Sequence, residues 1–233
     1  MTAPSLVIAV PSKGRLKEQA ASLFEAAGYT LRVKGHERGY RGQLDGLPDV
    51  AVEYTSAAEI VHQLRSGRVH LGITGEDLVR ETVHDVDSRI EFLAPLGFGH
   101  ADVVVAVPEC WLDVSRMADL EDVAEQFARS HGRGLRVATK YMNLTRRFFS
   151  QKGVTGYRIV ESVGATEATP ATGTSELIVD ITSTGTTLQA NHLKVLEDGL
   201  ILKSQAHLLA AKRASWGERA NELKAVVLGA LSG

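Results

Sequence analysis

Hydroxyl side chains and one glycine follow a short apolar run near residue 180. The run Leu177–Ile181 is rich in branched, β-prone residues, which is typical of a buried strand. The residues after it are Thr182, Ser183, Thr184, Gly185, Thr186 and Thr187. Glycine lets the backbone approach a ligand closely, and a helix that begins there directs free N–H groups at an anion. The pattern predicts an oxyanion site, most simply for a phosphate, with a plain turn as the alternative.

Asp180 lies inside this apolar run. An unpaired carboxylate is unfavourable in such surroundings. We therefore expect a polar ligand, a sugar or a group that bears a cation, to meet it. A plain turn needs a glycine and one or two hydroxyls, so the carboxylate favours the binding site over the turn.

Two cations flank a tight turn near the N-terminus. Lys13 and Arg15 lie on either side of Gly14, between an expected strand and an expected helix. The helix dipole disfavours cations at a helix N-terminus, so an anion held between them would explain their placement. A solvated basic turn is an equally good interpretation of this segment alone.

A third strand-to-helix turn has the composition of a helix start. Its residues are Gly75, Glu76 and Asp77. Glycine suits the turn, and carboxylates suit the first helical turn electrostatically. The segment is either a structural cap or a contact for a base or a ribose.

Basic residues follow a fourth expected strand, Leu135–Thr139. Lys140 comes directly after it, and Asn143 is expected to cap the helix that carries Arg146 and Arg147. The two arginines suit a solvated helix face equally well. Because ligands of open α/β sheets bind beyond the carboxyl ends of the strands, the four turns predict one cleft.

Composition narrows the classes of function. The chain has 233 residues, 44% of them hydrophobic, and a formal net charge of −2. The hydrophobic content is sufficient for a hydrophobic core. The near-neutral charge gives no net positive field that would attract nucleic acid or acidic lipid. A single cysteine, Cys110, excludes an internal disulfide and a multi-cysteine metal site. The eight histidines are scattered and suit structural or surface positions better than metal ligation, so we expect no metal site built by the protein alone. No signal peptide or membrane-spanning run is visible, which predicts a cytoplasmic protein.

Strand-like and helix-like segments alternate along almost the whole chain, which predicts α/β architecture with mostly parallel sheets. The expected strands are Leu6–Val10, Thr30–Val33, Val50–Tyr54, Val69–Thr74, Ile90–Leu96, Ala101–Val107, Leu135–Thr139, Tyr157–Val160, Leu177–Ile181, Val195–Leu196 and Leu200–Ser204. The expected helices are Leu16–Ala27, Ser56–Ser66, Gly75–Glu81, Leu120–Ser130, Leu144–Lys152, Glu167–Ala171 and a tail from Gln205 to Leu231. Residues 34–48 are expected to form a loop or a hairpin. The expected domains are residues 1–95 with 186–233, and residues 96–185.

The region from Glu167 to Leu188 resembles the signature of the ATP phosphoribosyltransferase family. The matching residues are Glu167, Gly173, Ser175, Asp180, Gly185, Thr187 and Leu188. The turns at Ser12–Leu16, Gly72–Asp77 and Ala138–Tyr141 resemble that family in the same order. The resemblance implies two α/β domains around a cleft, like a type II periplasmic binding protein. It also implies the short form, with no C-terminal regulatory domain.

The resemblance implies a reaction and its partners. N1 of the adenine of ATP attacks C1 of phosphoribosyl pyrophosphate, pyrophosphate leaves, and histidine biosynthesis begins. Mg²⁺ is implied as a cofactor, held chiefly by substrate phosphates. The implied partner resembles histidyl-tRNA synthetase, in a hetero-octamer that contains homodimers of the catalytic chain.

The resemblance also implies roles for the residues singled out above. The residues implied for phosphoribosyl pyrophosphate are Lys140, Asp180, Thr182, Ser183, Thr184, Gly185, Thr186 and Thr187. Those implied for ATP are Lys13, Arg15, Gly75, Glu76, Asp77 and Glu167. Lys13 and Arg15 are the candidate catalytic residues, because the transition state places charge on the ribose and on departing pyrophosphate.

The chain departs from the family after the third expected strand. Many relatives have arginine there, where this chain has Val52–Ser56. Arg38 and Arg41 are possible substitutes. The departure leaves open a rival hypothesis, a two-domain protein that binds a phosphorylated nucleotide without turnover.

Overall fold

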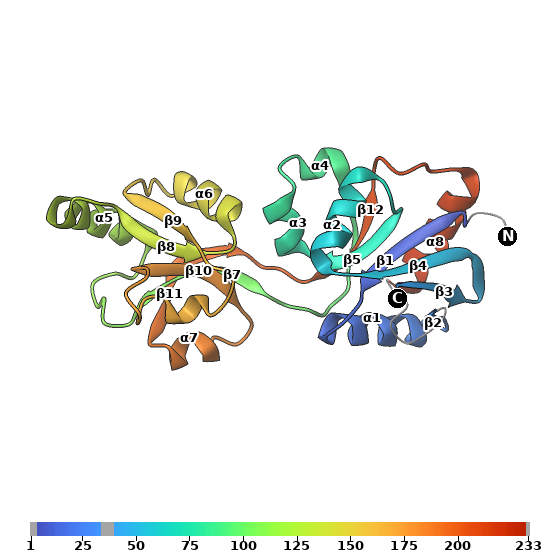
Figure 1. Ribbon diagram of the computed structural model, residues 1–233, viewed down its shortest axis with the longest axis horizontal. Helices are drawn as coiled ribbons and strands as arrows, with labels where there is room; N and C mark the ends of the chain where they lie inside the picture. The colour runs from blue at the N-terminus through green and yellow to red at the C-terminus, as the bar shows by residue number, and fades with distance from the viewer. Residues whose placement is uncertain (1–3, 34–39, 232–233) are drawn as a thin grey trace. The chain divides into compact units, whose positions relative to one another are not determined.

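The computed structural model describes residues 4–33 and 40–231. It divides into two compact units, which are treated separately below (Figure 1). The first unit is Met1–His100 with Gln205–Gly233, and the second is Ala101–Ser204. The return to the first unit, expected at residue 186, occurs at residue 205 because the strand after residue 192 joins the second sheet.

The first unit is built on a seven-stranded sheet in the order β2-β3-β4-β1-β5-β12-β6. Its strands are β1 (Leu6–Pro11), β2 (Thr30–Val33), β3 (Arg41–Asp45), β4 (Leu47–Thr55), β5 (Leu71–Gly75), β6 (Ile90–Pro95) and β12 (Ala206–Ala211). β1 runs parallel to β4 and β5, whereas β12 is antiparallel to both of its neighbours. β3 pairs antiparallel with β2 and β4, so the described part of residues 34–48 is a hairpin.

Helices cover both faces of this sheet. They are α1 (Arg15–Ala26), α2 (Ala57–Ser66), α3 (Glu76–Thr82), α4 (Val86–Arg89) and α8 (Glu218–Leu231). Ile8 packs with residues of α1 and α8, while its neighbour Ala9 packs with residues of α2 and α3. The alternation along β1 therefore serves a core on each face.

The second unit has a five-stranded sheet in the order β11-β7-β10-β8-β9. Its strands are β7 (Asp102–Pro108), β8 (Leu135–Thr139), β9 (Tyr157–Glu161), β10 (Leu177–Thr182) and β11 (Leu193–Leu202). Its helices are α5 (Met117–His131), α6 (Met142–Gln151), α7 (Thr186–Ala190) and the short 3₁₀ helix η1 (Thr166–Ala168). β8 is parallel to β9 and β10, whereas β7 is antiparallel to β10 and β11. α5 and α6 pack on one core, and Leu188 of α7 packs on another.

Both sheets are therefore mixed, and the expectation of mostly parallel sheets was wrong. The helical tail expected from Gln205 was also wrong at its start, because Ala206–Ala211 is strand β12. Leu208 packs into one core of the first unit and Leu209 into the other. Burial on both faces between β5 and β6 outweighs the helix propensity of these residues.

The two short strands expected near residues 195 and 200 are one strand, β11, with irregular register. Within the described residues, no helix is long and apolar enough to cross a membrane.

Candidate functional site

The hydroxyl-rich segment forms a turn between β10 and α7 in the second unit, as the sequence predicts. Thr182 ends β10, and its Oγ1 accepts a hydrogen bond from the backbone N–H of Gly185 at 2.9 Å. Gly185 has φ 78°, a left-handed conformation that favours glycine. The hydroxyls of Thr184 and Thr186 lie 2.9 Å apart, and both side chains are exposed. The turn thus presents several hydroxyls to solvent from a fixed backbone.

Asp180 is half-buried at the same end of β10. Burial raises the pKa of its carboxyl above the usual value, and a hydrogen bond from the Ile181 N–H and the charge of Lys140 oppose this only in part. The neighbouring charge of Glu167 raises that pKa further. The structure therefore brings Lys140, Glu167 and Asp180 within electrostatic reach of one another.

Strand pairing explains why Lys140 lies near Asp180. β8 runs parallel to β10, with Ala138 opposite Ile178. The carboxyl ends of parallel strands meet at one edge of a sheet, so the residue after β8 lies beside the end of β10. Asn143 is not a helix cap, because α6 begins at Met142.

Glu167 lies in the segment between β9 and β10, and hydroxyl hydrogen bonds and an ion-pair cluster fix that segment in place. Its neighbour Thr166 is buried and donates a hydrogen bond to the Ser162 hydroxyl at 3.0 Å. Further along, the hydroxyls of Thr169 and buried Ser175 are 2.8 Å apart. These contacts give the segment between β9 and β10 a defined path.

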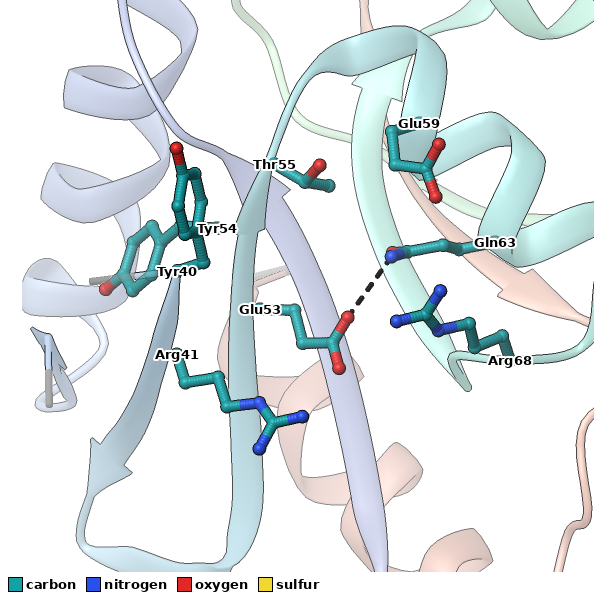
Figure 2. Close-up of a pocket in the computed structure, with 8 residues that line it drawn as sticks. All are labelled: Tyr40, Arg41, Glu53, Tyr54, Thr55, Glu59, Gln63 and Arg68. Carbon is teal, nitrogen blue, oxygen red and sulfur yellow. Dashed lines mark hydrogen bonds between the residues drawn. The ribbon is translucent and has the colours of Figure 1, made fainter. Parts of the chain in front are cut away.

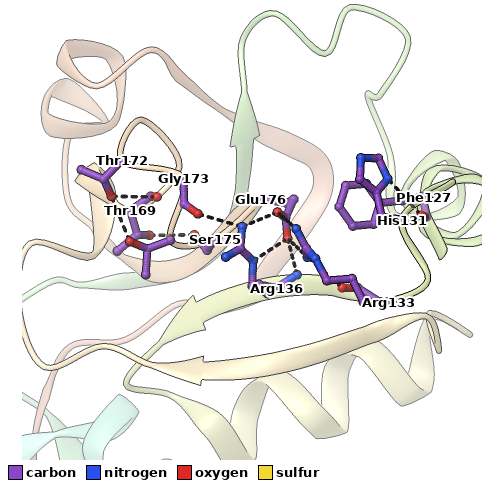
Figure 3. Close-up of polar contacts among 11 residues, drawn as sticks. Phe127, His131, Arg133, Arg136, Thr169, Thr172, Gly173, Ser175 and Glu176 are labelled. Atoms are coloured by element: carbon purple, nitrogen blue, oxygen red, sulfur yellow. Dashed lines mark hydrogen bonds and ion pairs between the residues drawn. The ribbon is translucent and has the colours of Figure 1, made fainter.

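Glu176 anchors the end of this connection (Figure 3). Its Oε1 accepts hydrogen bonds from Arg136 at 2.7 Å and from Arg133 at 3.0 Å. Arg136 also donates to the Gly173 carbonyl at 2.8 Å. Burial alone would raise the pKa of Glu176, but these hydrogen bonds outweigh burial and lower it to about 2. Sequence reasoning missed this cluster, although an acidic residue directly before a buried strand was a signal for it.

In the first unit, two predicted turns share one edge of the sheet. β1 is parallel to β5, with Ile8 opposite Leu71, so the turn after each strand lies at the same edge. Lys13 and Arg15 are exposed, and neither side chain has a hydrogen bond or ion pair with a described residue. Gly14 between them has φ 76°. This edge therefore carries two cations that are available to an anion.

The turn after β5 is engaged within its own unit. Glu76 accepts a hydrogen bond from Arg80 at 2.5 Å and lies 3.9 Å from His207. Its backbone N–H donates to the Gln205 carbonyl at 3.1 Å. Gly75 has φ −71°, which any residue adopts, so the turn does not require glycine for its conformation. Asp77, in the first turn of α3, is partly buried.

The structure describes only one of the two arginines considered as substitutes for the family's arginine after the third expected strand. Arg38 lies outside the described residues. Arg41 begins β3 and lines a pocket together with Glu53 of β4 (Figure 2).

Comparison with known proteins shows the family. A family model described as "HisG: ATP phosphoribosyltransferase" matches residues 56–229. The chain belongs to the ATP phosphoribosyltransferase family. Its activity is that of an ATP phosphoribosyltransferase, which catalyses the first step of histidine biosynthesis.

Curated relatives of this family differ in length. An ATP phosphoribosyltransferase of Bradyrhizobium sp. (strain ORS 278) is 58% identical over 223 residues, which cover 96% of this chain and 69% of that protein. One of Chelativorans sp. (strain BNC1) is 60% identical over 210 residues, which cover 90% of this chain and 91% of that protein.

Solved structures confirm the fold. The ATP phosphoribosyl transferase (HisG:HisZ) complex from Thermotoga maritima contains a chain with a TM-score of 0.69 and 24% identity, covering 97% of this chain and 96% of that one. The extracellular-binding protein ytmK from Bacillus subtilis has a TM-score of 0.55 at 11% identity, with 99% and 92% coverage. The alkanesulfonate-binding protein SsuA from Xanthomonas axonopodis has a TM-score of 0.53 at 16% identity, with 99% and 73% coverage. The periplasmic-binding-protein-like fold expected from the sequence is thus confirmed.

Proposed function

We propose that the chain transfers the phosphoribosyl group of phosphoribosyl pyrophosphate to N1 of the adenine of ATP. The observation that carries this assignment is the convergence of Lys140, Glu167 and Asp180 beside the exposed hydroxyl turn. In this proposal the turn from Thr182 to Thr187 seats the 5′-phosphate, with Ser183 among its exposed hydroxyls.

Asp180 is proposed to accept hydrogen bonds from the ribose hydroxyls. Burial raises the pKa of this carboxyl, so its ionised form is poorly solvated. Hydrogen-bond donors on a ligand stabilise the ionised form, because they replace the water that burial removed. Lys140 is proposed to contact a phosphate of the same substrate, since its side chain is exposed and its ammonium is at the same edge.

The chemical step forms a bond between N1 of adenine and C1 of the ribose and breaks the bond from C1 to a pyrophosphate oxygen. The electron pair of the broken bond leaves with pyrophosphate, and positive charge develops on the ribose. No protein nucleophile is needed, so the work of the protein is to position the substrates and to stabilise charge. Lys13 and Arg15 are proposed to stabilise the negative charge, because no described residue neutralises them.

The residues proposed for ATP are Lys13, Arg15, Gly75, Glu76 and Asp77 in the first unit and Glu167 in the second. Gly75, Glu76 and Asp77 lie at the same edge as Lys13 and Arg15. Gly75, Glu76 and Asp77 are all proposed to contact ATP, Glu76 while it is bound to Arg80.

Mg²⁺ is proposed to arrive with the substrate phosphates. Among the described residues, no group of three or more metal-ligating side chains is present. Asp180 and Glu167 nevertheless lie within electrostatic reach of one another, and two carboxylates suit a cation that phosphates hold on its other side. When bound, the ion supplies neutralisation of charge on departing pyrophosphate.

The short form of the family, and a regulatory partner that resembles histidyl-tRNA synthetase, remain part of the proposal. Support comes from the Thermotoga maritima complex, in which HisG is paired with HisZ. The hetero-octamer and the homodimer within it are proposed by the same resemblance.

Pyrophosphate release tests the proposed function. ATP, phosphoribosyl pyrophosphate and Mg²⁺ are added to the chain with and without its partner, and pyrophosphate is measured over time. We expect release that depends on all three, and that falls at least tenfold in Arg15→Gln, because a charge-assisted contact contributes roughly 1.5–3 kcal/mol. Arg32→Gln, an exposed arginine on β2, serves as the control. Binding of both substrates without release would leave the binding-module hypothesis instead.

A further inference from the structure

A basic pocket of about 280 Å³ lies in the first unit, at the edge of the sheet opposite the turns proposed for ATP. β12 runs antiparallel to β5, with Ala210 opposite Leu71, so Arg213 of the pocket lies beyond the start of β5. The Gly75 turn follows the end of the same strand. The five residues of β5 span roughly 15 Å, so the pocket is separate from the substrate edge.

Three arginines from distant parts of the chain converge on this pocket. Its charged and titratable lining residues are Arg65, His84, Asp85, Arg89 and Arg213. Backbone contacts bring the segments together. The Lys212 N–H donates to the Arg89 carbonyl at 2.8 Å, which ties the segment after β12 to the end of α4.

A glycine brings the end of α2 against the same segment. Gly67 caps α2 with φ 76°, and a Cβ added to it would lie 2.6 Å from the carbonyl oxygen of Arg213. Contacts that short do not occur in folded proteins, so a side chain there would push the two segments apart. The fold thus holds Arg65, in the last turn of α2, close to Arg213.

Two of the three guanidinium groups have no partner among the described residues. Arg89 pairs with Asp85, with Nε 2.8 Å from the carboxylate. The hydrogen bond from Arg89 is the main reason that the pKa of Asp85 falls to about 2. Neither Arg65 nor Arg213 has a hydrogen bond or an ion pair with the part of the chain that the structure describes. With His84 neutral, three positive charges and one negative charge give the lining a net charge of +2, in a chain of net charge −2.

Structural roles account for only part of this charge. Arg65 suits the last turn of α2, where the helix dipole favours a cation. Arg89 is neutralised by Asp85. His84 and Arg213 lie outside the helices and are exposed, and His84 also lacks a partner within the described residues. Because like charges held together repel, an anion would stabilise the arrangement.

The size and charge of the pocket select the class of ligand. Its volume is close to the lower end of small-molecule sites, about 300–1,000 Å³. A single arginine can bind both oxygens of a planar carboxylate, whereas guanidinium groups from three segments suit a tetrahedral oxyanion. The exposed hydroxyl of Thr82 adds a donor on the same lining. We propose that the pocket binds a phosphate group, either inorganic phosphate or the phosphate of a small monoester.

NMR titration of the full chain at constant pH tests the proposal. The ring signals of His84 are the readout because this residue lines the pocket, and His84→Gln assigns them. Inorganic phosphate and glycerol 3-phosphate are the probes, and we expect at least one to shift the signals with a Kd of about 1 mM or lower. Tighter binding of glycerol 3-phosphate would identify a monoester site, and tighter binding of inorganic phosphate a site for the free anion. Sodium chloride at the same ionic strength should leave the signals unchanged.

Variants locate the binding in this pocket. Arg65→Gln and Arg213→Gln are changes at exposed positions that spare the core, and each should weaken the response at least fivefold. Arg32→Gln, at an exposed arginine on β2 outside the lining, is the matched control. Arg15→Gln should respond like the unaltered chain, because Arg15 follows the opposite edge of the sheet.

Several results would overturn the proposal. They are His84 signals that neither probe moves, an equal response to chloride, two pocket variants that bind like the unaltered chain, or loss of the response in Arg15→Gln. A DNA oligonucleotide that moves the signals at lower concentration than either probe would show a nucleic-acid site instead. Pyrophosphate release in the transferase assay is a separate readout, so failure here leaves the proposed function intact.

Discussion

At the scale of single residues, Asp180 carries a charge that the ligand-free protein holds at a cost. Burial raises the pKa of its carboxyl, and the nearby Glu167 acts in the same direction. Lys140 and the Ile181 N–H offset only part of this. Residues that sacrifice stability in this way are concentrated at binding sites, where a ligand supplies the missing contacts.

Asp180→Asn should therefore stabilise the protein and weaken substrate binding. The raised pKa means that the ionised form is disfavoured in the folded state, so the contribution of Asp180 to stability declines as pH rises through that pKa. At pH 7 the melting temperature of the variant should rise, while its affinity for phosphoribosyl pyrophosphate falls by roughly 10–100-fold. Calorimetry measures both. Asp113→Asn, an exposed change in the same unit, is the control, and equal affinities of all three proteins would remove Asp180 from the site.

Glu176 behaves in the opposite way. Its pKa is lowered to about 2, so its stabilising effect is complete above its ordinary pKa near 4.5 and is lost as pH falls from there toward 2. Glu176→Gln should lower the free energy of unfolding by about 2 kcal/mol at pH 7 and have little effect at pH 2. Urea unfolding at a series of pH values checks this.

Glu125→Gln is the matched control for that series. Glu125 pairs with Arg129, but both side chains are well exposed, at 65% and 74%. Exposed ion pairs contribute about 0–1 kcal/mol. If Glu125→Gln lowered the free energy of unfolding as much as Glu176→Gln does, the larger effect expected for the less exposed ion pair would be contradicted.

At the scale of elements, the strand-to-helix turns were predictable and β12 was not. The turn after β10 can be predicted from the local sequence, because hydroxyls and Gly185 follow an apolar run within a few residues. Ala206–Ala211 contains alanine and leucine, which also suit a helix, and its strand state depends on β5 and β6, more than a hundred residues earlier in the chain. Glu176 is likewise visible in the sequence as an acidic residue before a buried strand, but its partner Arg136 lies 40 residues away and no local pattern identifies it.

The turn between β10 and α7 should not tolerate substitution of Gly185 by a residue with a branched side chain. Its φ of 78° is left-handed, and no described atom lies within 4 Å of an added Cβ, so a side chain meets backbone strain and not a clash. Gly185→Val should cost about 1–2 kcal/mol of stability and weaken phosphoribosyl pyrophosphate binding, since the turn must relax.

Gly153→Val separates the two effects. Gly153 has φ 77°, equally open surroundings and a position at the far end of α6. It should lose similar stability and keep its affinity. Unchanged affinity in Gly185→Val would exclude the turn from the phosphate site.

At the scale of the whole molecule, the proposed groups divide between the units. Lys140, Glu167 and the segment from Asp180 to Thr187 belong to Ala101–Ser204, whereas Lys13 and Arg15 belong to the other unit. The second unit is continuous in sequence, and the Ala101 N–H donates to the Ser204 carbonyl at 2.9 Å, so its two ends meet.

Residues 101–204 expressed alone should therefore fold cooperatively. The fragment contains the whole second sheet and its helices, and should bind ribose 5-phosphate more weakly than the full chain binds phosphoribosyl pyrophosphate. Thermal unfolding and NMR titration test this, with Gly185→Val in the fragment as the control that should abolish binding. A fragment without cooperative unfolding would show that the second unit depends on the first.

The place of β12 in the first sheet has a consequence for biosynthesis. β12 lies between β5 and β6, yet the ribosome makes it after every strand of the second unit. Until it emerges, β5 and β6 each lack a neighbour, whereas every strand of the second unit has already been synthesised. The second unit should therefore fold first during synthesis, and the sheet of the first unit should be completed only when β12 has been made. A chaperone that shields β5 and β6 during that interval would act on this protein before its release from the ribosome.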